Sequence, residues 1–195
     1  MARLALYFAL ATAFCVAVVD YPVARWVAAH DTHPAAWHAV LHVLEYAIGL
    51  EPWEWIGVVV LVTGSIAALL YKRGAVPWLA VTISHLLANN LTMWMKLGFG
   101  RLRPHQWHGG ATWFHHGLSF PSGHMTLFAS IVLPIVALYP RLRGLLVVLV
   151  FVGCARVMMS AHFVSDVVGG FALCCAITAL SVAIARRSQQ PGGAR

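Results

Sequence analysis

One short segment of the chain, "ARVMMSAHFVSD" at residues 155–166, combines residue types that can do chemistry. It places Arg156, His162 and Asp166 between strongly apolar runs. At a spacing of i and i+4, His162 and Asp166 share one face of a helix. A carboxylate that accepts the proton of one imidazole nitrogen fixes the tautomer and leaves the other nitrogen as a nucleophile or base. A purely structural hydrogen-bonded pair is the alternative interpretation.

A second segment, "FPSGHMTLFA" at residues 120–129, has the pattern of a helix start beside an anion site. Ser122 is a favourable N-cap residue, and the free N–H groups that follow it attract anions. Gly123 allows the backbone to approach a ligand closely. His124 falls in the first turn, where its imidazole could protonate a leaving group. Capping alone explains Ser122 but not Gly123 and His124.

A third segment, "KLGFGRLRP" at residues 96–104, supplies cations. An arginine such as Arg103 grips a phosphate in a bidentate way, and the ammonium of Lys96 adds a point charge. Contact with anionic lipid headgroups is the simpler interpretation of a basic loop, and it accounts for Arg101.

Together these segments supply cations, a helix N-terminus, two histidines and a carboxylate. Such a set suits phosphoryl transfer, in which catalysis is mostly positioning and charge stabilisation. The sequence has no carboxylate cluster or Cys/His set that would form a Mg²⁺ or Zn²⁺ cage, so we expect neither a metal nor another cofactor.

The composition predicts a polytopic membrane protein. Of 195 residues, 61% are hydrophobic and 10% are charged, whereas soluble domains carry about 25% charged residues. The net charge of +7 does not indicate nucleic-acid binding, because the basic residues lie at the ends of apolar segments and form no stripe.

The fold class we predict is all-α, with six transmembrane helices in one bundle and one domain over residues 1–195. A helix needs about 20 largely apolar residues to cross the hydrocarbon core. The candidate spans are 4–20, 55–71, 77–95, 122–139, 144–161 and 164–185.

The segment 21–54 between the first two spans contains an amphipathic pattern. Its apolar positions repeat at helical spacing, while three polar residues fall elsewhere on the wheel, which predicts a short helix lying in the membrane interface. The apolar set is Trp37, Leu41, Leu44 and Ile48, and the polar set is His38, His42 and Glu45.

Six spans place the N- and C-termini and most basic residues on one side, which the positive-inside rule makes the cytoplasm. The motifs at 96–104, 120–129 and 155–166 then converge on the other side. We expect a bacterial inner-membrane protein whose site faces the periplasm.

The three motifs resemble the signature of the type 2 phosphatidic acid phosphatase superfamily, K-x6-R-P, P-S-G-H and S-R-x5-H-x3-D. The chain has Lys96 with Arg103-Pro104, then "PSGH" at 121–124, then Arg156, His162 and Asp166. The departure is Ala155, where the family usually has serine, which removes one hydrogen bond to phosphate and leaves the charged set complete.

The resemblance implies a role for each matching residue. His162 would attack phosphorus and form a phosphohistidine, Asp166 would orient it, and His124 would protonate the leaving oxygen. The phosphate-binding set would be Lys96, Arg103, Arg156, Ser122 and Gly123.

The resemblance also implies the substrate class. Six-span members of the family act on lipid phosphates or pyrophosphates, such as phosphatidic acid, phosphatidylglycerophosphate, isoprenyl pyrophosphate and lipid A. The expected partners are such a substrate and membrane lipids, without nucleic acid. A transporter or proton relay and a non-catalytic lipid-binding family member are the alternatives. The sequence gives neither the headgroup nor the oligomeric state.

Overall fold

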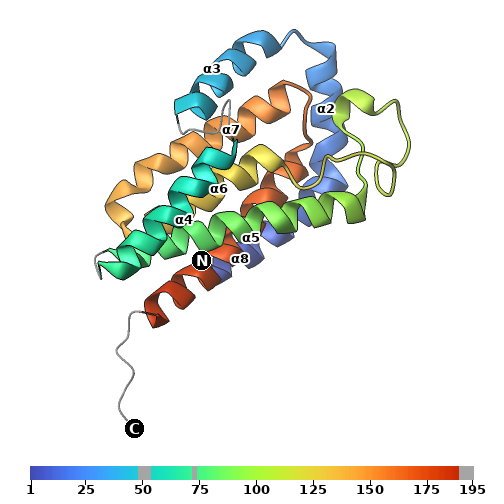
Figure 1. Cartoon of the computed structure of the whole chain (residues 1–195). Helices are drawn as coiled ribbons and strands as arrows, with labels where there is room; N and C mark the ends of the chain where they lie inside the picture. Colours follow the sequence, from blue (N-terminus) through green and yellow to red (C-terminus); the bar gives the residue numbers. More distant parts are fainter. Residues whose placement is uncertain (48–53, 72–73, 189–195) are drawn as a thin grey trace.

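The computed structural model of the chain describes residues 1–47, 54–71 and 74–188, and this part contains helices and connecting loops but no strand (Figure 1). The α-helices are α1 (Ala2–Phe14), α2 (Asp20–Ala29), α3 (Pro34–Ala47), α4 (Glu54–Leu70), α5 (Ala75–Phe99), α6 (Gly123–Leu138), α7 (Leu146–Met158) and α8 (Val164–Arg187). A π-helical segment at Cys15–Val19 joins α1 to α2, and short 3-10 segments occur at Pro104–Gln106 and Pro140–Leu145.

A helix occupies each of the six predicted spans, with one clear difference at the first. The prediction ends the first span at residue 20, but α1, the π-helical segment and α2 run on without a break to Ala29. Asp20 does not end the helix, because its carboxylate has buried hydrogen-bond partners inside the bundle.

By length and composition, two helices in the described part could each cross a membrane, Ala2–Ala29 with 28 residues and Val164–Arg187 with 24. Gly57–Leu70 and Gly123–Leu138 are apolar but shorter. These helices are consistent with a helical membrane protein. Six spans with cytoplasmic termini stay a prediction.

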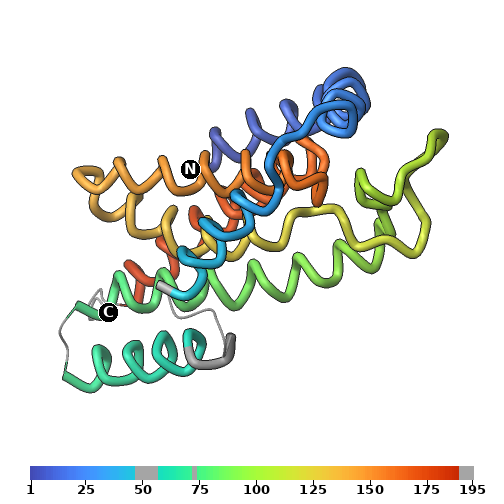
Figure 2. The backbone as a smooth tube through the Cα atoms, turned by 90° about the horizontal axis from the view of Figure 1, so that it is seen from above, coloured from blue at the N-terminus to red at the C-terminus, as the bar shows by residue number. Residues whose placement is uncertain are grey.

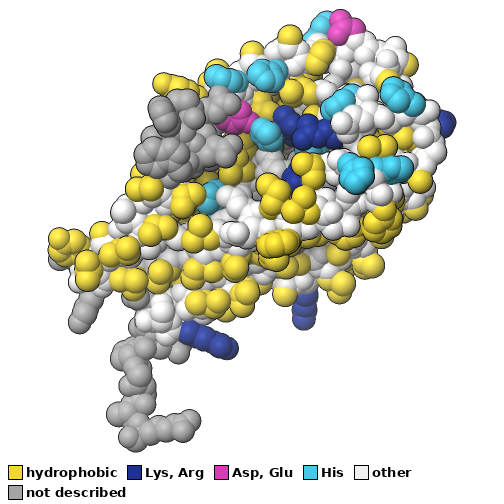
Figure 3. All heavy atoms as spheres, turned by 45° about the vertical axis from the view of Figure 1, so that its right-hand side comes forward, with side chains coloured by type: hydrophobic (Ala, Val, Ile, Leu, Met, Phe, Trp, Pro, Cys, Tyr) yellow, Lys and Arg dark blue, Asp and Glu magenta, His cyan; other side chains and the backbone are white. Residues whose placement is uncertain are grey.

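Large apolar side chains cover much of the surface. Leu10 on α1 is 62% exposed and Val147 on α7 is 69% exposed, and Figure 3 shows many hydrophobic side chains across the lower part of the face in view. Soluble monomers rarely expose contiguous apolar surface on this scale. This surface fits contact with lipid.

Helix α8 lies at the centre of the bundle and packs against α1, α5, α6 and α7. Both views place the C-terminal end of α4, the start of α5 and the 3-10 segment at 140–145 at one end of the molecule (Figures 1 and 2). The loop between α5 and α6 and the α7–α8 junction lie toward the other end. This second end carries the three motifs.

Helix α3 is the amphipathic helix predicted between the first two spans. It packs along α7, where the rings of Trp37 and Phe151 are 5.4 Å apart and Leu41 is only 2% exposed. Its apolar face therefore rests on the bundle. The predicted contribution of Ile48 lies outside the described residues.

Candidate active site

The fold brings the three motifs together from four helices and two loops. Lys96 lies in the last turn of α5, Ser122 is the N-cap residue of α6, and Arg156 lies in the last turn of α7. Asp166 lies in the first turn of α8. The side chains that interact electrostatically at this end of the bundle are Lys96, Arg103, His124, Arg156, His162 and Asp166.

His162 and Asp166 form the pair expected from their spacing, but not on one helix. His162 precedes α8, which begins at Val164, and its Nδ1 lies 3.5 Å from Asp166 Oδ2. The loop geometry arises because the Asp166 carboxylate also accepts the N–H of Phe163 at 2.9 Å and so caps the helix. His162 is 2% exposed. With Nδ1 turned to the carboxylate, Nε2 is the nitrogen available for chemistry.

Ser119 adds a further hydrogen bond to this pair. Its hydroxyl donates to Asp166 Oδ2 at 2.5 Å and lies 3.4 Å from His162 Nδ1. The carboxylate is thus held by several donors and cannot rotate without losing them. It presents a fixed acceptor to the imidazole.

Arg101 is fully buried, which corrects the sequence-based interpretation of a headgroup contact. Its guanidinium donates to Asp166 Oδ1 and to Asp20 Oδ2, each at 2.6 Å. Asp20 also accepts the backbone N–H of Ser165 at 2.9 Å. A buried guanidinium is stable only with such partners, because an unpaired charge in the interior is very costly.

Two aromatic rings enclose the same guanidinium. Its central carbon lies 4.2 Å from the ring centroid of Trp113 and 4.3 Å from that of Phe163. Arg101 therefore links α2, the long loop and α8 behind the nucleophile pair. Sequence reasoning missed Asp20, although a carboxylate inside an apolar helix was an available signal.

The start of α6 carries polar groups that are free to meet a ligand. Ser122 is the N-cap residue as predicted, but its side chain makes no capping hydrogen bond. In the described part of the chain, Ser122 Oγ and Arg156 Nε are buried and have no hydrogen-bond partner. A Cβ built on Gly123 would lie 3.9 Å from Lys96 Nζ. The backbone of Gly123 and the ammonium thus border the same space.

The cations are held by the ends of α5 and the loop that follows. Lys96 Nζ donates to the carbonyl of Leu118 at 2.6 Å. Arg103 precedes the 3-10 segment, and its N–H donates to Gln106 Oε1 at 3.0 Å. Arg103 is close enough to Lys96 and Arg156 to destabilise both positive charges. An anion such as phosphate relieves this repulsion.

Burial and the neighbouring cations set the protonation of two groups. Burial lowers the pKa of His162 to about 4, against the opposing effect of the Asp166 carboxylate. Burial and the positive charge of Arg103 lower the pKa of Lys96 to about 8. At neutral pH the imidazole of His162 is therefore neutral and can act as a nucleophile, while Lys96 keeps its charge.

Glu45 joins the site from α3, and sequence reasoning missed it. Its Oε1 lies 2.7 Å from His124 Nε2. The helical pattern did place Glu45 one turn from the buried Leu41, which was the available signal. Figure 3 shows acidic, histidine and basic side chains gathered together on this face of the molecule.

The described residues contain no group of three or more His, Cys, Asp or Glu side chains that could hold a metal ion. The histidines of the 105–116 loop do not gather into a ligand set, and His105 Nδ1 instead lies 3.0 Å from the carbonyl of Ser160.

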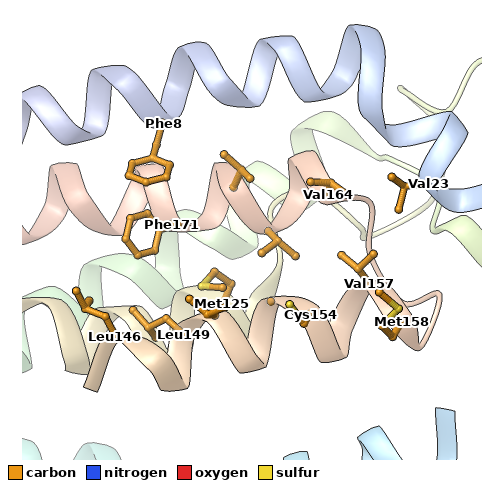
Figure 4. A pocket seen from close by; sticks show the side chains of 14 residues that line it. Phe8, Val23, Met125, Leu146, Leu149, Cys154, Val157, Met158, Val164 and Phe171 are labelled. Carbon is orange, nitrogen blue, oxygen red and sulfur yellow. The ribbon is translucent and has the colours of Figure 1, made fainter. Parts of the chain in front are cut away.

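The large apolar groove of the bundle is separate from this chemistry. It has a volume of about 560 Å³, and its walls come from α1, α2, α6, α7 and α8. Figure 4 shows Phe8 and Phe171 toward one end, and Val157 and Met158 toward the other. Its lining offers no charged side chain, so a phosphate group would find no partner there.

The comparisons with known proteins agree with the motif assignment. Residues 77–190, more than half of the chain, match the PAP2 superfamily. The chain is 36% identical over 107 residues to a lipid A 1-phosphatase of Rhizobium johnstonii, covering 51% of this chain and 42% of that protein. It is also 36% identical over 110 residues to a lipid A 1-phosphatase of Rhizobium etli, covering 51% and 44%. The chain thus spans less than half the length of these relatives. No solved structure matches it.

Proposed function

Because the chain belongs to the PAP2 superfamily, we propose that it is a membrane-embedded phosphatase that removes phosphate from a lipid at the site formed by Lys96, His124 and His162. The observation that carries this proposal is that the imidazole of His162, oriented by Asp166, lies near buried hydrogen-bond donors that have no partner. Ser122 Oγ and Arg156 Nε are such donors in the described part, and buried polar groups normally have partners. A phosphate oxygen would supply them.

In the first proposed step, Nε2 of His162 attacks phosphorus. The P–O bond to the lipid breaks, and its electron pair leaves with the lipid oxygen, which takes a proton from His124. The product is a phosphohistidine, since a nitrogen–phosphorus bond replaces the ester bond. Lys96, Arg103 and Arg156 stabilise the charge on the phosphoryl oxygens.

In the second step, water replaces His162. His124 takes a proton from the water, whose oxygen bonds to phosphorus as the nitrogen–phosphorus bond breaks. Inorganic phosphate leaves, and both histidines return to their starting states. Asp166 keeps His162 in the tautomer that can attack again, in the manner of the carboxylate in a catalytic triad.

The substrate class follows from the surroundings of the site and from the relatives. Exposed apolar side chains on α1 and α7 suit a substrate that stays in the bilayer. Two relatives are named lipid A 1-phosphatase, so the 1-phosphate of lipid A is the first substrate to test. The site would face the periplasm, because the basic segments of the predicted topology lie at the opposite end.

The test is phosphate release by the purified protein in detergent with a chelator present. The panel is lipid A, phosphatidic acid, phosphatidylglycerophosphate and an isoprenyl pyrophosphate. We expect release from at least one lipid that is lost in His162→Ala. Absence of release from every lipid would refute the proposal.

A further inference from the structure

A second carboxylate–imidazole pair lies at the mouth of the site. Glu45 Oε1 is 2.7 Å from His124 Nε2, and the two side chains are 11% and 35% exposed. At this distance the carboxylate attracts a protonated imidazole as an ion pair. Helix α3 holds the carboxylate in place, because Leu41, one turn before Glu45, is buried against the bundle.

The charges around His124 show why this contact matters. Lys96 on α5, Arg103 in the long loop and Arg156 on α7 are cations that act on His124. A general acid must nevertheless carry its proton when the leaving oxygen departs. Glu45 brings a negative charge into direct contact with this imidazole and also acts on Arg156.

Building on the proposed phosphatase function, we propose that Glu45 is a positioning residue that pairs with His124 on its Nε2 side and stabilises its imidazolium. Nδ1 is then the nitrogen that exchanges protons with the substrate. It gives its proton to the leaving oxygen in the first step and takes one from water in the second. Glu45 itself keeps its charge and gains or loses no proton.

The two histidines then face their carboxylates through different ring nitrogens. Asp166 lies at Nδ1 of His162, which frees Nε2 to attack phosphorus, whereas Glu45 lies at Nε2 of His124. Glu45 stands outside the three motifs and outside residues 77–190, which match the family. The N-terminal part of the chain thus completes a site whose other residues come from the matched region.

The experiment compares Glu45→Gln with Asp31→Asn as a matched control. Both changes replace a carboxylate by an amide, but Asp31 is 76% exposed, and it pairs with His33, which is similarly exposed. Each purified variant is assayed on an alkyl lipid monophosphate and on an activated aryl phosphate. The alkoxide needs a proton to leave, and the aryl oxide needs it far less.

We expect Glu45→Gln to lower kcat on the lipid phosphate by about 10- to 100-fold, within the roughly 10²- to 10⁴-fold range of general acid catalysis. The loss on the aryl phosphate should be much smaller. Asp31→Asn should match the wild type on both substrates.

The ratio of the two activities comes from one sample, so it does not depend on how much of the variant is folded. An equal loss on both substrates, or no loss on either, would overturn the role of Glu45. A wild-type protein that releases phosphate from neither substrate would instead refute the phosphatase function itself.

Discussion

Asp20→Asn tests whether the buried pair behind the nucleophile stabilises the fold. The Asp20 carboxylate accepts the guanidinium of Arg101 at 2.6 Å and the N–H of Ser165 at 2.9 Å, and both charged side chains are completely buried. Asparagine keeps the shape but removes the charge. Breaking a buried ion pair by removing one partner costs about 3–5 kcal/mol.

The loss should appear as a lower midpoint of thermal unfolding. For a chain of this size, about 1 kcal/mol corresponds to roughly 2–4 °C, so the midpoint should fall by roughly 6–20 °C. The assay is monodisperse elution in detergent after heating to a series of temperatures. Asp31→Asn is the control, since an exposed substitution of this kind changes stability by only about 0.5 kcal/mol.

A thermodynamic cycle separates the ion pair from other effects of the change. Arg101→Met removes the same pair from the other side, so the destabilisations of Asp20→Asn and Arg101→Met should not add in the double variant. Strict additivity, or an Asp20→Asn protein as stable as Asp31→Asn, would refute the reasoning.

Four further predictions concern catalysis and topology. His162→Ala should abolish turnover on every substrate, whereas His124→Ala should lose most on an alkyl phosphate; equal losses on both substrate types would contradict the assigned roles. The rate should rise with pH through about 4 as His162 becomes neutral and fall through about 8 as Lys96 loses its proton. Lys96→Arg should move the alkaline fall in rate to higher pH because arginine stays charged. An alkaline fall at unchanged pH would count against Lys96. Activity should survive a chelator and be inhibited by vanadate, which mimics the five-coordinate phosphorus of the transition state. A requirement for Mg²⁺ would contradict the mechanism. A cysteine placed in the 105–118 loop should react with an impermeant thiol reagent on whole cells, and labelling only after lysis would reverse the topology.

The sequence was enough to predict that the motif residues lie close together. Helices that alternate in direction have their ends at one or the other end of the bundle, and the motifs fall at ends on the same side. Lys96 ends one helix and Ser122 precedes another, so both had to lie at the same end of the bundle. The family assignment on these motifs is confirmed. The arrangement of the site needed only helix boundaries that are accurate to within one turn.

The partners of these residues could not be predicted in the same way. Arg101 and Arg103 stand two residues apart in one loop, and spacing alone does not tell which side chain turns inward. Asp20 and Glu45 are single acidic residues far along the chain from their partners Arg101 and His124. No periodicity links such residues, because their contacts depend on how α2 and α3 pack on the bundle.

Trapping the phosphorylated intermediate tests most directly whether His162 is the nucleophile. The protein is mixed with a substrate that carries a labelled phosphoryl group, quenched in base and digested, and the labelled peptide is identified. We expect label on His162 that is stable to base and labile to acid, and none in His162→Ala. Label on another residue, or rapid turnover by His162→Ala, would contradict it.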